Sequence, residues 1–218
     1  MAKLTGPLLS FGARGQIGKA MVTASWRGIS YARQYVIPSN PRTTAQQANR
    51  TRFAFLREMH KLSSAIIRAP WDAFATGRPF TGVNKFVGEN NRLLVGESDL
   101  AQMIMSPGAR GGLPPVSVTA TTGSGSGEID VSIVPPSQLP DGWLIQECAA
   151  AAVWDQDPVG LFDGPIASDI EATAPYDITL TGMGSAVPCM VFGWVVYEKP
   201  DGKLAYSVSI ADPATSGT

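Results

Sequence analysis

The spacing of apolar side chains predicts a long helix in the first third of the chain, within residues 39–68 (SNPRTTAQQANRTRFAFLREMHKLSSAIIR). Apolar residues recur there at steps of three and four, which is the period of a helix and not of a strand. Thr43 and Gln46 have the spacing of a capping box at its start, and Pro70 is expected to end it. The apolar stripe consists of Phe53, Phe55, Leu56, Met59, Leu62, Ile66 and Ile67.

Residues 19–37 have a different period, in which apolar and polar side chains alternate on both sides of Arg27-Gly28. This pattern predicts a β-hairpin with its turn at that dipeptide. A two-stranded hairpin is marginally stable in water, so we expect it to lie on the long helix or on another subunit. Residues 1–18 are glycine-rich without periodicity, and we expect an extended basic arm that something else holds in place.

A second helix is expected to begin after Thr81, whose hydroxyl suits an N-cap, and to end near Leu94. Residues 96–115 are rich in proline and glycine. We therefore place a linker there, between a basic anchoring domain of residues 19–95 and a second domain.

From residue 116 onward, short alternating or apolar runs are separated by glycine and proline turns. This pattern is typical of an antiparallel β-sandwich, which we place at residues 116–213 with a tail at 214–218. Residues 176–210 resemble the end of an immunoglobulin-like or fibronectin-type-III domain. The expected fold class is α+β in two parts. The expected strands are 116–121, 128–134, 143–154, 161–167, 176–180, 187–198 and 204–210.

Charge is divided unevenly along the chain, although the net charge is only −1. Residues 1–95 hold 14 of the 17 lysines and arginines and three acids, a formal charge of +11, whereas residues 96–218 carry −12. Such asymmetry suggests that the basic part meets an acidic partner, the alternative being a solvated basic face. We expect Arg42, Arg50, Arg57 and Lys61 to lie nearer to acids of other chains than to Asp155, Asp157 or Asp163 of their own.

The residues that most catalytic and metal sites need are scarce. His60 is the only histidine, and with Cys148 and Cys189 it is too little for a zinc site. Asp155 and Asp157 alone do not make a calcium loop. We therefore expect no enzyme and no cofactor. There is no secretory signal or membrane-length apolar run, so reduced buried thiols are favoured over a disulfide between the two cysteines.

Basic and aromatic residues are interleaved in the first half, with Trp26, Tyr31 and Tyr35 among the arginines. Phosphate neutralisation and base stacking use these residue types, so nucleic-acid binding is an alternative to a protein interface. A glycan-acting enzyme with a carbohydrate-binding β-domain is a weaker alternative.

A set of motifs in residues 15–95 resembles a pattern in uncharacterised proteins of tailed bacteriophages and prophages. The resemblance implies a structural protein of the virion, made in the bacterial cytoplasm, whose partners are copies of itself and other virion proteins. It names no catalytic residues. The motifs are Gly18-Lys19, Trp26-Arg27-Gly28, Asn40-Pro41-Arg42-Thr43, Gln46 or Gln47, Arg50, Phe53, Asn84 and Phe86. The residues that we expect to anchor the chain are Arg14, Lys19, Trp26, Arg27, Arg33, Arg42, Arg50, Arg57 and Lys61.

Overall fold

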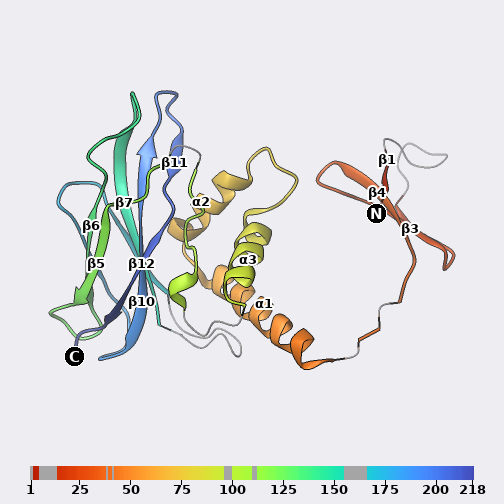
Figure 1. The fold of residues 1–218 in the computed structure, drawn as a ribbon, viewed down its shortest axis with the longest axis horizontal. Coiled ribbons are helices and arrows are strands. Elements are labelled where there is room, and N and C mark those ends of the chain that lie inside the picture. Colours follow the sequence, from red (N-terminus) through yellow and green to blue (C-terminus); the bar gives the residue numbers. More distant parts are fainter. Residues whose placement is uncertain are drawn as a thin grey trace. The chain divides into compact units, whose positions relative to one another are not determined.

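The structure is a computed structural model, and it describes residues 2–4, 14–37, 39–40, 42–95, 100–109, 112–154 and 166–218. The chain divides into two compact units. The first consists of residues 1–43 with 77–80, and the second of residues 44–76 with 81–218. Figure 1 shows the strands of the first unit in red and orange, and the helices and sheets of the second from orange to blue.

The first unit contains the expected hairpin, formed by β3 (Met21–Trp26) and β4 (Ile29–Gln34). Arg27 and Gly28 make the turn, and both have positive φ, which is what a two-residue hairpin turn of this kind requires. The hairpin is not alone, because β1 (Ala2–Leu4) pairs with β4 and β2 (Gly15–Ile17) pairs with β3. Parts of the expected arm are therefore edge strands of a four-stranded antiparallel sheet.

The second unit begins with three helices, and the expected single long helix is in fact two. The first, α1 (Thr44–Leu62), begins one residue after Thr43, and α2 (Ala65–Ala75) follows a break at residues 63 and 64. We expected Pro70 to end a helix, and this was wrong. Pro70 is buried inside α2 on the same stripe as Ile67 and Trp71. Packing of that stripe compensates for the backbone hydrogen bond that proline cannot donate.

The third helix, α3 (Gly82–Leu93), confirms the second expected helix. The Thr81 hydroxyl accepts a hydrogen bond from the Asn84 N–H at 3.2 Å, which is the predicted N-cap contact. A short 3₁₀ turn, η1 (Leu100–Gln102), follows.

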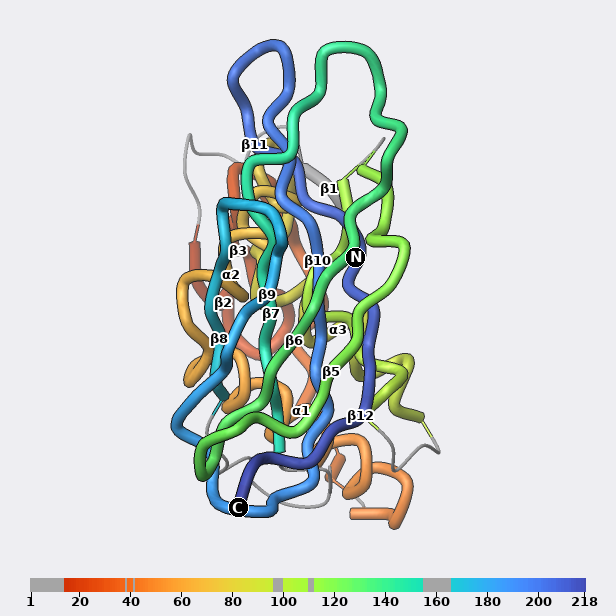
Figure 2. The backbone as a smooth tube through the Cα atoms, turned by 90° about the vertical axis from the view of Figure 1, so that its left-hand side faces the viewer, coloured from red at the N-terminus to blue at the C-terminus, as the bar shows by residue number. Residues whose placement is uncertain are grey.

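Two antiparallel sheets complete the second unit and form a sandwich (Figures 1 and 2). The three-stranded sheet has the order β5-β6-β9, and the five-stranded sheet has the order β11-β10-β7-β8 with β12 also paired to β10. Most of the expected strands are confirmed, but the last one is two strands. Residues 161–165 of the expected edge strand lie outside the described residues, and residues 166 and 167 begin β8. The strands are β5 (Ser117–Thr122), β6 (Ile129–Val134), β7 (Leu144–Val153), β8 (Ile166–Glu171), β9 (Tyr176–Leu180), β10 (Pro188–Glu198), β11 (Leu204–Tyr206) and β12 (Ile210–Thr215).

The five-stranded sheet is buried on both faces. Alternate residues of β7 and β10, such as Ala151 and Phe192, form a core with Phe55, Trp71 and other residues of the helices. The intervening residues, such as Val191, form a second core with the three-stranded sheet. This double burial explains why residues 148–153 of β7 and 189–197 of β10 are continuously apolar instead of alternating.

The helices and the sandwich therefore belong to one compact unit, whereas the sequence led us to expect a boundary at residues 96–115. The physical reason is the shared core, because α1, α2 and α3 bury their apolar stripes on the outer face of the five-stranded sheet. Residues 96–99 and 110–111 of the expected linker lie outside the described residues.

Candidate functional site

The nine expected anchoring residues lie in both units. Arg14, Lys19, Arg27 and Arg33 belong to the four-stranded sheet or its turns, and all four are exposed. Trp26 is 45% exposed at the end of β3. Arg42 precedes α1 and has a φ of 52°. The remaining three, Arg50, Arg57 and Lys61, are on α1.

The three basic residues of α1 share one side of the helix. At 3.6 residues per turn, the separations of seven and four residues bring Arg50, Arg57 and Lys61 onto one face. All three are exposed, whereas Phe55, Leu56 and Met59 on the other side are buried in the core. The alternation of apolar and basic positions thus produces a helix with one face in the core and one basic face at the surface.

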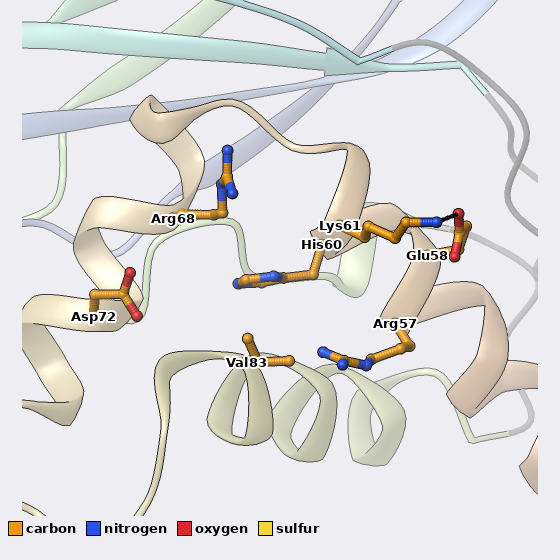
Figure 3. A pocket seen from close by; sticks show the side chains of 7 residues that line it. All are labelled: Arg57, Glu58, His60, Lys61, Arg68, Asp72 and Val83. Atoms are coloured by element: carbon orange, nitrogen blue, oxygen red, sulfur yellow. Dashed lines mark hydrogen bonds and ion pairs between the residues drawn. The ribbon is translucent and has the colours of Figure 1, made fainter.

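Arg57 and Lys61 also line a pocket where the three helices meet (Figure 3). Its volume is about 530 Å³. The pocket wall comprises Arg57, Glu58, His60 and Lys61 from α1, Arg68 and Asp72 from α2, and Val83 from α3. The side chains of Arg57, Lys61 and Arg68 therefore line one pocket. This arrangement requires the chain to turn back between α1 and α2.

His60 forms the buried part of the pocket wall. The residue is only 4% exposed, and its ring packs on Phe86 with 5.2 Å between the ring centroids. In Figure 3 the imidazole lies between the side chains of Arg68 and Arg57. Burial lowers the pKa of His60, and the two arginines lower it further, against an opposing effect of Asp72. Its Nε2 atom is buried without a hydrogen-bond partner among the described residues.

The two acids of the pocket are each next to a positive group. Glu58 Oε1 accepts a hydrogen bond from Lys61 Nζ at 2.7 Å. The Asp72 carboxylate lies directly against Gly82, the first residue of α3, where the helix dipole is positive. Of the three pocket cations, Lys61 is paired with Glu58. The guanidinium groups of Arg57 and Arg68 form no ion pair with Glu58 or Asp72.

A second, smaller pocket of about 250 Å³ adjoins the first and shares Arg57 and Val83 with it. It lies between α1 and α3, and Phe53, which is 53% exposed, is part of its wall. Together the two pockets give the helical layer a surface with both basic and apolar contacts.

The outer face of the three-stranded sheet has the opposite character. Cross-strand register places Thr121, Asp130 and Thr179 in one row, and Thr119, Ser132 and Asp177 in the next. These residues line a hollow of about 410 Å³. No lysine or arginine occurs in β5, β6 or β9, so this face is polar and acidic.

The two charged surfaces do not neutralise each other within the unit. Residues 44–76 with 81–95 hold seven basic and three acidic residues, while 112–154 with 166–218 hold two basic and ten acidic ones. Ion pairs between described residues join sequence neighbours, as in Lys61–Glu58, Lys85–Glu89, Arg92–Glu89 and Lys203–Asp201. Asp155, Asp157 and Asp163 lie outside the described residues.

Metal-binding clusters and membrane-spanning helices are absent from the described part of the chain. No group of three or more histidine, cysteine, aspartate or glutamate residues there is arranged to hold a metal ion. Its helices are all too short or too polar to cross a lipid bilayer. Cys148 and Cys189 are free and buried, and burial raises their pKa values to about 12 and about 11. They are inert core thiols, as the sequence favoured.

Comparison with known proteins does not assign the chain to a family. No family model matches the chain, and no curated protein matches it. Among solved structures, the chain is similar to a β-sandwich protein from a computer-based redesign, with 15% identity and a TM-score of 0.33. That similarity covers 48% of this chain and 90% of the other, and at this TM-score it carries no argument about fold or function.

Proposed function

We propose that this chain is a structural subunit of a tailed-phage virion, present in many copies as a capsid decoration protein or a component of the neck or tail. The basic N-terminal part anchors the subunit, and the sandwich, which we regard as immunoglobulin-like or fibronectin-like, projects from the particle. The resemblance of residues 15–95 to phage and prophage proteins is one support for this proposal.

The observation that carries the proposal is the exposure of the four-stranded sheet. Among residues 14–37 only Thr23 is buried. Large apolar side chains of this region are exposed: Ile17 by 56%, Trp26 by 45%, Val36 by 65% and Ile37 by 77%. A small sheet with little buried apolar surface is poorly stabilised by itself, so these side chains suit a surface that another chain covers.

A direct test is to purify tailed particles from the strain that encodes the chain and to measure their protein content by quantitative mass spectrometry. The proposal predicts a fixed number of copies per particle that survive washing in high salt. Absence from particles that contain the other structural proteins would contradict it.

Nucleic-acid binding is the second candidate, and the register of the hairpin favours it. Trp26, Tyr31 and Arg33 lie on one face of the sheet, because Trp26 pairs with Ile29, Ala24 with Tyr31 and Val22 with Arg33. Aromatic rings beside a guanidinium group are what base stacking and phosphate contact use. Retardation of DNA by the wild-type chain, lost in a Trp26→Ala and Arg33→Ala variant, would support this function.

A further inference from the structure

We propose that the pocket between α1, α2 and α3 binds acidic side chains from the outer face of the three-stranded sheet of a second copy of this chain. Arg57 and Arg68 are the cations that hold the incoming carboxylates, and Asp177 and Asp130 supply them. The inference rests on the proposed role as a subunit present in many copies, and it names the surfaces through which those copies meet.

The pocket has features of an anion-binding site. Arg57 and Arg68 approach His60 from two sides, and their charges both lower its pKa. The His60 Nε2 has no hydrogen-bond partner among the described residues, although the side chain is almost completely buried. The Nε2 atom itself has almost no exposed surface, so an incoming carboxylate would pair with the two guanidinium groups beside the ring through charge-assisted hydrogen bonds.

The outer face of the three-stranded sheet supplies the matching chemistry. Asp177 is exposed, and Asp130 accepts a hydrogen bond from the Thr179 hydroxyl at 2.7 Å, which fixes one carboxylate oxygen. No basic residue of β5, β6 or β9 competes for them. Each surface also presents an exposed apolar side chain, Phe53 beside the pocket and Val134 on β6. The two surfaces are therefore complementary in charge and in apolar character.

The layer order explains why the partner is a second copy. The helices cover one face of the five-stranded sheet, and the three-stranded sheet covers the other (Figure 1). The basic pocket and the acidic face are thus on opposite sides of the unit and cannot meet within one chain. Contact between two copies is heterologous, so its repetition produces a ring or a helical array.

Charge-reversal variants test this contact by sedimentation velocity of the full chain. The pocket variant is Arg57→Glu with Arg68→Glu, and the face variant is Asp130→Lys with Asp177→Lys. Wild-type protein is expected to associate at about 0.05 M salt and less at about 0.5 M. Each variant alone is expected to associate on the order of 30-fold more weakly, since reversing either partner creates like-charge contacts.

The decisive sample is an equimolar mixture of the two variants. In the mixture the reversed pocket meets the reversed face, and the native pocket meets the native face, so association is expected to return. Lys199→Glu with Lys203→Glu is the matched control for the pocket variant, because it makes the same change in net charge in the turn between β10 and β11. Circular dichroism of each variant establishes that it is folded.

Three results would overturn the inference: wild-type protein that stays monomeric at both salt concentrations, variants that associate like the wild type, or a mixture that does not recover. Loss of DNA retardation in the pocket variant with unchanged self-association would assign the pocket to phosphate instead. These failures are distinguishable from failure of the proposed function, because the copy number in purified particles is measured independently of the variants.

Discussion

The four-stranded sheet of the first unit and the five-stranded sheet of the second are both antiparallel, but they differ in what covers them. Phe192 in β10 is completely buried between the sheet and the helices, whereas Trp26 in β3 is 45% exposed. Both strands have apolar side chains suited to a sheet. The second unit therefore holds its own core, whereas the first leaves large apolar side chains exposed, which is why we propose that another chain covers them.

The largest effect is expected from separating the helices from the sandwich. A fragment of residues 112–218 exposes the face of the five-stranded sheet that carries Phe192 and Trp194, so it is expected to aggregate or unfold. A fragment of residues 44–218 keeps both cores and is expected to fold. Amide dispersion in NMR spectra of the two fragments measures this. A well-dispersed spectrum from residues 112–218 would restore the boundary that the sequence suggested.

Truncating one aromatic side chain in each region sharpens the comparison. Phe192→Ala removes a fully buried ring and is expected to lower the free energy of unfolding by about 3–5 kcal/mol. Trp26→Ala is expected to change that free energy by less than about 0.5 kcal/mol in the monomer, as for other surface substitutions. Urea denaturation of both variants gives the two values, and equal losses would remove the distinction between the regions.

A single methyl group probes how closely the two sheets of the sandwich pack. A Cβ added at Gly193 would lie 2.7 Å from Val118 Cγ2 and 3.2 Å from Ile133 Cδ1. Gly193→Ala is therefore expected to destabilise the protein by about 1–3 kcal/mol. Gly88→Ala on α3 is the control, since nothing lies within 4 Å of the added carbon. That control is expected to be neutral or stabilising by up to about 1 kcal/mol, as measured by thermal unfolding.

A smaller effect on stability is expected from the N-cap of α3 at Thr81. Thr81→Ala removes the hydroxyl that accepts from the Asn84 N–H, and a loss of about 1 kcal/mol is expected. Thr81→Ser keeps the oxygen and should retain most of the stability. If the alanine variant unfolded at the same urea concentration as the wild type, the capping contact would have no energetic role.

The smallest expected effect is the pH dependence that His60 gives to the free energy of unfolding. Burial lowers the pKa of His60 from 6.5 in the folded state, so its full contribution to stability is present above about pH 6.5. As the pH falls below that value the unfolded chain binds the proton first, and the free energy of unfolding decreases until the folded pKa is reached. The test compares the free energy of unfolding of the wild type with that of His60→Gln from pH 7.5 to 5. The difference between the two proteins isolates the effect of His60 from the opposite effect of Glu147, whose pKa is raised by burial.

The sequence was sufficient to predict most strands of the sandwich, because alternation and glycine or proline turns are local signals. It did not reveal the break between α1 and α2. The apolar stripe continues through Leu62 and Ile66, while the Ser63 hydroxyl bonds back to the Met59 carbonyl at 2.8 Å. Residues of both helices belong to the same core, so the apolar stripe gives no local sign of where α1 ends.

The pocket was not predicted from the sequence, for the same reason. Arg57 and Lys61 are four residues apart and so lie on one face of a single helix. Arg68 and Asp72 join them only because α2 turns back, and that turn was missed. The lone His60 offered no signal that its Nε2 would be buried without a partner among the described residues.

Hydrogen exchange followed by mass spectrometry tests the central claim most directly. We expect amides of β7 and β10 to be protected in both the monomer and the assembled particle, since their sheet is covered on both faces. Amides of β3 and β4 should exchange rapidly in the monomer and become protected by at least about tenfold in the assembly. Equal protection of β3 and β4 in the two states would show that the four-stranded sheet is stable without another chain, and would contradict the account.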